Sequence, residues 1–170
     1  MTDPNQPLLA ARGGQWAGLL LSLAVTALAA VLGAVASANA AGFYGVLAKP
    51  TWAPSPRIFG PVWTVLYLLM AIAAWLVWCR RGLSAAKVPL ALFIVQLVLN
   101  ALWTWVFFRW RSGGWALAEI IALWLVLLFT VVSFWRVRTA AGVLLIPYMV
   151  WVTFATALTA AVWRRNPGVL

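Results

Sequence analysis

Five long apolar stretches, separated by short segments that carry nearly all the charged residues, dominate the chain. Only the fourth stretch contains a charged residue, Glu119. A helix that crosses a bilayer needs about 20 residues with few or no charges, and each stretch meets this requirement. The pattern therefore predicts an all-α membrane protein, a bundle of five transmembrane helices at residues 16–36, 59–79, 88–108, 115–135 and 142–163.

Composition supports the same fold class. The chain is 66% hydrophobic and 8% charged, whereas a soluble globular domain has about 25% charged residues. We expect a multi-pass integral membrane protein in contact with lipid. The segments outside the spans are short: an N-terminal tail at 1–15, a proline-rich loop at 43–58 and a C-terminal tail at 164–170.

The net charge of +10 could suggest nucleic-acid binding. However, the basic residues are divided among short loops and tails and form no continuous stripe, so we expect no nucleic-acid partner. Six basic residues fall on each side of the predicted bundle, and the positive-inside rule therefore does not define an orientation.

The first apolar stretch allows two interpretations. A basic residue, an apolar run and the small residues Ala38-Asn39-Ala40 resemble a signal peptide, but the run fills a whole span, which favours a retained helix. Small residues recur along one face of this helix, as expected of a packing seam. They are Gly18, Ser22, Thr26, Ala29 and Gly33.

Cysteine and histidine usage limits the chemistry. Cys79 is the one cysteine, and the chain has no histidine. An intrachain disulfide and histidine ligation of zinc or haem are therefore excluded. We expect no metal site and no cofactor.

Prolines define the segment between the first two spans. Lys49, Pro50, Trp52 and Pro54 lie in a stretch that cannot be regular helix, because prolines lack an amide donor and fix φ. The stretch predicts a stiff loop at the membrane surface. It could be a structural cap on the bundle or a lid over a ligand site.

Three predicted helices each carry a row of aromatic residues at helical spacing, interrupted by a few polar groups. Gln96 and Asn100 lie near mid-span, where an amide must face protein, water or ligand rather than lipid. Such rows could line a pocket for a flat apolar ligand or serve helix packing. The rows are Trp63 and Tyr67; Gln96, Asn100, Trp103 and Phe107; and Tyr148, Trp151 and Ala155.

These residues also carry a resemblance to a known family. The chain resembles the tryptophan-rich sensory protein, or translocator protein, family over about residues 16–163. The matching motifs are Phe43-Tyr44, Leu47 to Pro56, Phe59, Trp63, Leu66-Tyr67, Gln96, Leu99-Asn100, Trp103, Phe107-Phe108, Pro147-Tyr148, Trp151, Phe154-Ala155 and Leu158.

The resemblance implies a homodimeric five-helix protein with a ligand cavity beneath the loop. We expect a membrane receptor or carrier for porphyrins such as protoporphyrin IX, with Trp63 and Asn100 as polar anchors. The chain has no tyrosine just before Arg164-Arg165, so the animal cholesterol motif is absent. The expected ligand-binding residues are Tyr44, Trp63, Asn100, Trp103, Phe107, Tyr148, Trp151 and Ala155, and the expected lid residues are Lys49, Pro50, Trp52 and Pro54.

Two alternative functions remain open from the sequence. The first is an enzymatic one, light- and oxygen-dependent breakdown of bound porphyrin, in which Trp63 and Trp151 would be the residues that react. The second is export of a small molecule, although the chain shows no inverted repeat and no paired broken helices.

Overall fold

A computed structural model describes residues 6–170, and every regular element in this range is helical. Five of the helices are long and apolar enough to cross a membrane. This confirms the predicted all-α fold class and the multi-pass membrane location. The elements are α1 (Gln6–Ala36), α2 (Ala40–Val46), η1 (Pro56–Ile58), α3 (Phe59–Ala85), α4 (Lys87–Thr104), η2 (Trp105–Arg109), α5 (Gly113–Val137) and α6 (Thr139–Arg165).

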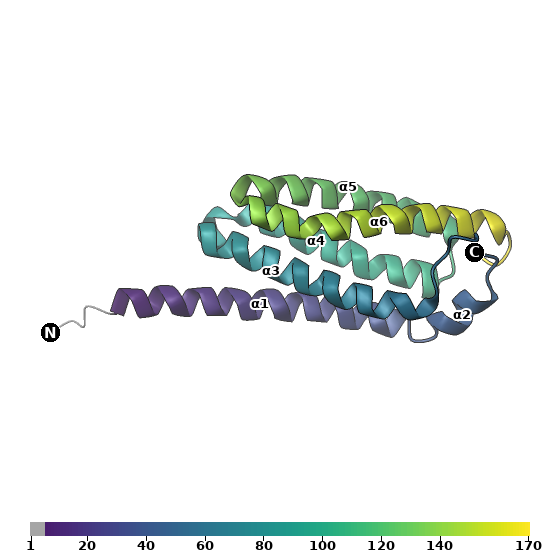
Figure 1. Ribbon diagram of the computed structural model, residues 1–170, viewed down its shortest axis with the longest axis horizontal. Coiled ribbons are helices and arrows are strands. Elements are labelled where there is room, and N and C mark those ends of the chain that lie inside the picture. The colour runs from purple at the N-terminus through teal and green to yellow at the C-terminus, as the bar shows by residue number, and fades with distance from the viewer. Residues whose placement is uncertain (1–5) are drawn as a thin grey trace.

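The long helices lie side by side along one axis (Figure 1). Short connections make neighbours in sequence run antiparallel. Helix α1 packs mainly against α3 and α4, α3 also packs against α6, and α5 lies between α4 and α6. The main hydrophobic core joins α3, α4, α5 and α6 through buried residues such as Met70, Phe93, Leu127 and Tyr148. Helix α1 contributes little to this core and is the least buried of the five spanning helices.

Four of the predicted spans each lie within one helix, and three of the predicted boundaries differ from the structure. The third span continues past α4 into η2, a π-helical turn in which the Trp110 amide donates to the carbonyl oxygen of Trp105 (2.9 Å). The predicted loop at 43–58 begins inside α2. Of the predicted tail at 1–15, residues 1–5 lie outside the described part of the chain, and the chain is helical from Gln6.

The small-residue face of α1 forms a packing seam around Gly18 and Ser22, whereas Thr26 and Gly33 line a cavity. Ser22, Thr26 and Ala29 are buried. A Cβ atom at Gly18 would lie 2.6 Å from Cδ1 of Trp78, so only glycine lets the indole ring cover the helix backbone there. The Trp78 indole N–H then donates to the carbonyl oxygen of Gly14 (3.2 Å). These contacts fix the position of α1 against α3.

The loop after α2 is held at its beginning by two side chains. The Lys49 ammonium group donates to the carbonyl oxygens of Tyr44, Gly45 and Leu47 at the C-terminus of α2, where backbone oxygens otherwise lack partners. The Asn166 carboxamide, just beyond α6, accepts from the Ala48 amide (2.8 Å) and donates to the Ala48 carbonyl (2.9 Å). The loop is thereby attached to the end of the bundle.

Candidate functional site: an aromatic cavity

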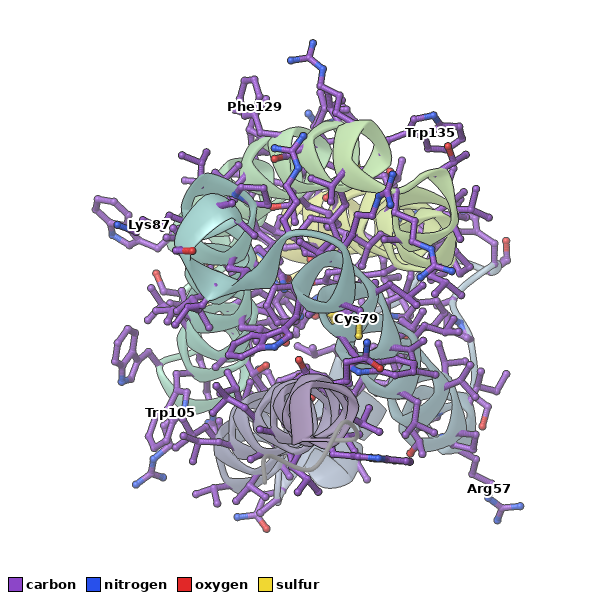
Figure 2. All side chains as sticks on the ribbon, turned by 90° about the vertical axis from the view of Figure 1, so that its left-hand side faces the viewer. Arg57, Cys79, Lys87, Trp105, Phe129 and Trp135 are labelled. Carbon is purple, nitrogen blue, oxygen red and sulfur yellow. The ribbon has the colours of Figure 1, made fainter. Side chains whose placement is uncertain are left out.

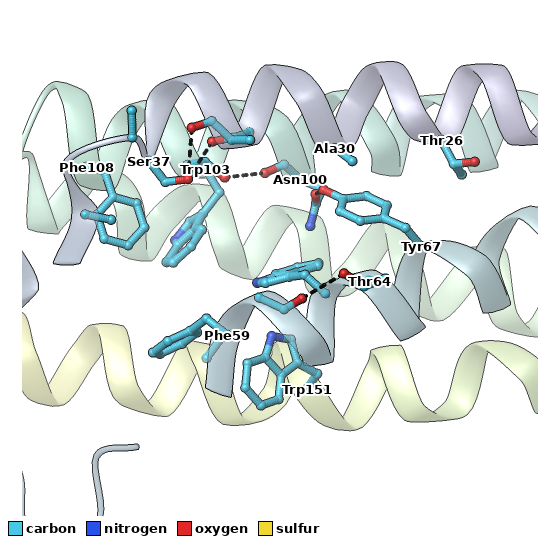
Figure 3. A pocket seen from close by; sticks show the side chains of 18 of the residues that line it. Thr26, Ala30, Ser37, Phe59, Thr64, Tyr67, Asn100, Trp103, Phe108 and Trp151 are labelled. Carbon is cyan, nitrogen blue, oxygen red and sulfur yellow. Dashed lines mark hydrogen bonds between the residues drawn. The ribbon is translucent and has the colours of Figure 1, made fainter. Parts of the chain in front are cut away.

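A cavity of about 670 Å³ lies between α1, α3 and α4, in the half of the bundle next to α2 (Figure 3). Helix α6 contributes Trp151 and Ala155 to its wall, and α2 with Pro56 closes its end. The lining residues are Leu23, Thr26, Ala27, Ala30, Gly33, Ala34, Ser37, Ala38, Ala40, Ala41, Tyr44, Pro56, Phe59, Gly60, Trp63, Thr64, Tyr67, Leu68, Asn100, Trp103, Thr104, Phe108, Trp151 and Ala155.

Aromatic rings from α3 and α6 form one wall of the cavity. Trp63 and Trp151 meet edge to face, with ring centroids 6.5 Å apart at 86°. Phe59 packs on Trp151 in the same way (5.8 Å, 74°), and Tyr67 lies beside Trp63 (5.5 Å). Because edge-to-face pairs hold each ring in a defined orientation, this wall presents fixed aromatic surfaces to the cavity.

A hydrogen-bonded chain of three side chains joins three helices at the cavity. The Tyr67 hydroxyl of α3 donates to Oδ1 of Asn100 in α4 (2.6 Å), and Nδ2 of Asn100 donates to the Tyr148 hydroxyl of α6 (3.1 Å). Asn100 and Tyr148 are buried. Tyr67 and Asn100 meet at the cavity wall, as Figure 3 shows. The amide at mid-span is therefore satisfied by protein, and its first role is to connect helices.

Trp103 differs from Asn100 in having an unused polar group. It lines the cavity, and its ring stacks on Phe107 (5.3 Å, 16°). Its indole N–H is buried and has no hydrogen-bond partner among the described residues. A buried donor without an acceptor costs about 1–3 kcal/mol, so an acceptor on a bound molecule would remove this cost.

Helix α1 forms the opposite wall with small side chains. Ala27, Ala30 and Ala34 face the cavity together with Gly33 and Ser37. The Ser37 hydroxyl donates to the Gly33 carbonyl (2.8 Å), and the Thr26 hydroxyl donates to the Ser22 carbonyl (2.6 Å), both within α1. Their hydroxyl protons are used within the helices, so this wall is largely a surface of methyl groups.

The structure brings six of the predicted ligand-binding residues to the cavity and leaves two outside its lining. Tyr148 is fully buried behind the wall, where it contacts Trp63 and Asn100. Phe107 is buried in a second core cluster with Leu47, Val106 and Leu158. The six that line the cavity are Tyr44, Trp63, Asn100, Trp103, Trp151 and Ala155.

The π-helical turn explains the place of Phe107. A helix with 3.6 residues per turn would put residue 107 on the same face as Asn100 and Trp103. In the π turn η2 the hydrogen bonds span five residues instead of four. Each later residue therefore takes the position that the preceding residue would have in a regular α-helix. Phe108 therefore lines the cavity in place of Phe107.

The predicted lid residues also lie outside the lining. Pro50 is buried, whereas Trp52 is half exposed and packs edge to face on Phe154 (5.7 Å). The Tyr44 hydroxyl donates to the Pro54 carbonyl (3.4 Å), and burial raises the pKa of Tyr44. Tyr44 of α2 and Pro56 at the end of the loop therefore line the cavity, whereas Lys49, Pro50, Trp52 and Pro54 lie outside its lining.

Sequence reasoning did not assign the α1 wall, Phe59, Thr64 or Thr104 to the site. Alanines and glycines carry no chemical signal of a ligand site, and their spacing indicates packing equally well. Tyr67 was placed on an aromatic row but not among the binding residues. Its position at i+4 from Trp63 was the available signal.

Comparison with known proteins gives this geometry a family context. A model of the TspO/MBR family matches residues 20–164. The chain belongs to the TspO/MBR family. The matched region covers most of the first span, nearly all of the other four, and the Pro-rich segment, so the resemblance inferred from the motifs is confirmed.

Curated relatives of the TspO/MBR family cover most of the chain. Protein CrtK of Rhodobacter capsulatus is 39% identical over 84% of this chain and 88% of its own length. The translocator protein of Homo sapiens is 40% identical over 74% of this chain and 76% of its own. The tryptophan-rich sensory protein of Cereibacter sphaeroides is 38% identical over 89% and 92%.

Proposed function

We propose that the cavity binds a flat, largely apolar aromatic molecule that carries a hydrogen-bond acceptor, and that a porphyrin such as protoporphyrin IX is such a ligand. The unpartnered indole N–H of Trp103 carries the proposal. Buried polar groups in folded proteins are nearly always paired. A donor without an acceptor, in a side chain that lines the cavity, fits a site that is completed by a ligand.

The dimensions and chemistry of the cavity support this ligand class. Its volume of about 670 Å³ falls within the range of about 300–1,000 Å³ that is typical of small-molecule sites. The rings of Trp63 and Trp151 offer stacking surfaces, and the methyl groups of α1 face them across the cavity. Such a slot suits a planar ligand.

The charged groups of a porphyrin need separate partners. Lys49 is one basic residue near this end of the bundle, but its ammonium group is occupied by three carbonyl oxygens. Arg57 is exposed and directly follows Pro56, which lines the cavity. We therefore assign the carboxylate contact to Arg57, by charge-assisted hydrogen bonds at the membrane surface.

Porphyrin titration of three proteins tests the proposal. Trp103→Phe keeps an aromatic ring and removes the indole donor, so it should weaken binding about 5- to 150-fold, equivalent to about 1–3 kcal/mol. Trp115→Phe is the matched control, since Trp115 is 75% exposed and outside the cavity. Quenching of tryptophan fluorescence in darkness gives the affinities. Equal affinity of all three proteins would refute the assignment of Trp103.

A second candidate function, light-dependent porphyrin breakdown, is favoured by the place of Trp63 and Trp151. Both line the cavity, with ring centroids 6.5 Å apart. An excited porphyrin in the presence of oxygen would lie against two oxidisable indoles. Illumination in air should then bleach the porphyrin bands faster than in a protein-free control, and Trp63→Phe or Trp151→Phe should slow the loss. A stable porphyrin spectrum under light would exclude breakdown and leave binding as the proposed function.

The homodimer implied by the family resemblance stays a prediction.

A further inference from the structure

A second hollow lies at the opposite end of the bundle from the aromatic cavity. It has a volume of about 580 Å³ and is lined by Cys79, Arg80, Val137 and Arg138. These residues come from the end of α3 and from the junction of α5 and α6, so segments nearly 60 residues apart in the sequence meet there. Figure 2 looks onto this end and shows Cys79 near its middle.

The backbone holds both arginines at the hollow. Arg80 lies in the last regular turn of α3, before Gly82 interrupts the helix with φ 68°, a conformation that favours glycine. Arg138 is the single residue between α5 and α6 and has extended dihedrals (φ −156°, ψ 118°). Their convergence therefore follows from a helix interruption and a tight connection.

No acidic group neutralises these arginines within the described residues. Glu119 is the one acidic side chain in residues 6–170. It precedes Val137 by 18 residues in α5, which corresponds to about 27 Å along the helix axis. Arg81, Arg136 and Lys87 lie at the same end as Arg80 and Arg138. Among residues 6–170, the hollow is therefore a region of uncompensated positive charge.

Backbone amides at the start of α6 add a partial positive charge beside the hollow. Helix α6 begins at Thr139, directly after Arg138, and has no side-chain cap. The amides of Ala141 and Gly142 donate to the Arg138 carbonyl, whereas those of Thr139 and Ala140 donate to no backbone acceptor in the described part of the chain. Free amides at the start of a long helix favour an anion. Here they adjoin an arginine that already lines the hollow.

Tryptophans indicate the depth of the hollow in the membrane. Trp78 lies two residues before Arg80, and Trp135, which is 44% exposed, lies three residues before Arg138. Tryptophan gathers at the interface between hydrocarbon and water, at the level of the lipid headgroups. The hollow is therefore at the depth where phosphate groups of lipids are concentrated.

We propose that the hollow between Arg80 and Arg138 is a binding site for a phosphate group, with the headgroup of an anionic phospholipid or a free phosphate anion as its source. Guanidinium groups bind phosphate oxygens with paired, charge-assisted hydrogen bonds. At the other end of the bundle Lys49 is held by carbonyl oxygens and Arg111 lies over the ring of Phe43.

Ligand-dependent thermal stability of the full-length protein in a neutral detergent tests the site. The probes are short-chain phosphatidylglycerol, short-chain phosphatidylcholine and inorganic phosphate. Phosphatidylglycerol should raise the melting temperature saturably. The variant Arg80→Gln/Arg138→Gln should weaken this binding roughly 30-fold, from two lost charges. The control Arg164→Gln/Arg165→Gln removes the same charge at the opposite end and should bind within about twofold of the unmodified protein.

The probes distinguish a lipid headgroup from free phosphate, and the variants test whether Arg80 and Arg138 bind it. A response to inorganic phosphate that equals the phosphatidylglycerol response, and is lost in the Arg80/Arg138 variant, identifies a soluble anion; a response to phosphatidylglycerol alone identifies the lipid. Equal affinity for phosphatidylcholine, unchanged affinity in the glutamine variant, or equal loss in the control overturns the site. Arg80→Lys/Arg138→Lys keeps both charges but loses the paired donors, so it should bind more weakly than the unmodified protein and more tightly than the glutamine variant. A loss as large as that of the glutamine variant would also overturn the proposal.

Discussion

Asn166 forms two hydrogen bonds with the backbone of a single residue, Ala48, 118 positions earlier in the chain. The carboxamide accepts from the Ala48 amide and donates to its carbonyl, and it also donates to the Val162 carbonyl of α6 (2.7 Å). Side chains seldom satisfy both polar groups of one residue in this way. The pair fastens the loop that carries Pro56 to the C-terminal end of α6.

The first prediction concerns this attachment. Asn166→Ala removes both bonds and leaves the two polar groups of Ala48 without a partner, so the loop should open more often. Porphyrin dissociation should become about 5- to 150-fold faster, equivalent to about 1–3 kcal/mol, while helical content stays the same. Stopped-flow fluorescence measures the rate. Asn39→Ala is the control, since Asn39 is exposed and makes no capping bond; an equal effect there would contradict the role of Asn166.

The second prediction separates stability from binding at Asn100. Asn100→Leu breaks the links to Tyr67 and Tyr148, and a side-chain hydrogen bond in a membrane protein contributes about 0.6–2 kcal/mol. We expect a lower melting temperature in detergent. Tyr148→Phe removes one of the same links, so the double variant should lose less than the sum of the single losses. Additive losses would show that the two residues do not act together.

The third prediction tests the π-helical turn. Phe107→Ala empties a buried site and should destabilise the protein by about 3–5 kcal/mol. Phe108→Ala, one residue later, removes a ring from the cavity wall and should mainly weaken porphyrin binding. Thermal melting and porphyrin titration of both variants give the comparison. The reverse pattern would mean that the helix continues without the π turn.

The fourth prediction concerns the α1 wall. Ala30 lines the cavity, so Ala30→Leu should occupy ligand volume and weaken porphyrin binding while the melting temperature stays close to that of the unmodified protein. Ala24→Leu is the control, because Ala24 is exposed on the same helix and outside the lining. Equal porphyrin affinity of the two variants would place the ligand away from α1.

The fifth prediction tests the seam between α1 and α3. Gly18→Ala would force the Trp78 ring away and break its bond to Gly14. Overpacking of this kind costs about 1–3 kcal/mol, which thermal melting would detect. A Cβ atom at Gly14 meets nothing within 4 Å, so Gly14→Ala should change the melting temperature little. Equal melting temperatures of the two variants would show that the Trp78 ring can move away from α1 without a loss of stability.

Much of the fold followed from the sequence because a bilayer imposes a simple rule. Long apolar runs between charged residues must become helices, and the period of 3.6 residues fixes which side chains share a face. This reasoning placed Trp63, Asn100 and Trp151 on facing rows, and the structure brings these three residues to one cavity.

The remaining features depend on events that local periodicity does not encode. The π turn changes the register at Trp105–Arg109 and exchanges the positions of Phe107 and Phe108. The bond from Asn166 to Ala48 joins distant segments. The small residues of α1 indicate close packing, and only the three-dimensional arrangement shows that some of them face a cavity while others, such as Gly18, lie under a ring.

The arrangement of α1 gives the cavity one wall that is separate from the main core. Helices α3, α4, α5 and α6 share that core, whereas α1 lies against it through small side chains and is the least buried span. A movement of the cavity end of α1, with the Gly18–Trp78 contact kept, would change the width of the cavity without repacking Met70, Phe93 or Leu127. We therefore expect the protein to accept planar ligands of different thickness and to discriminate among them weakly by size, so that selectivity depends on the few polar groups at the cavity wall.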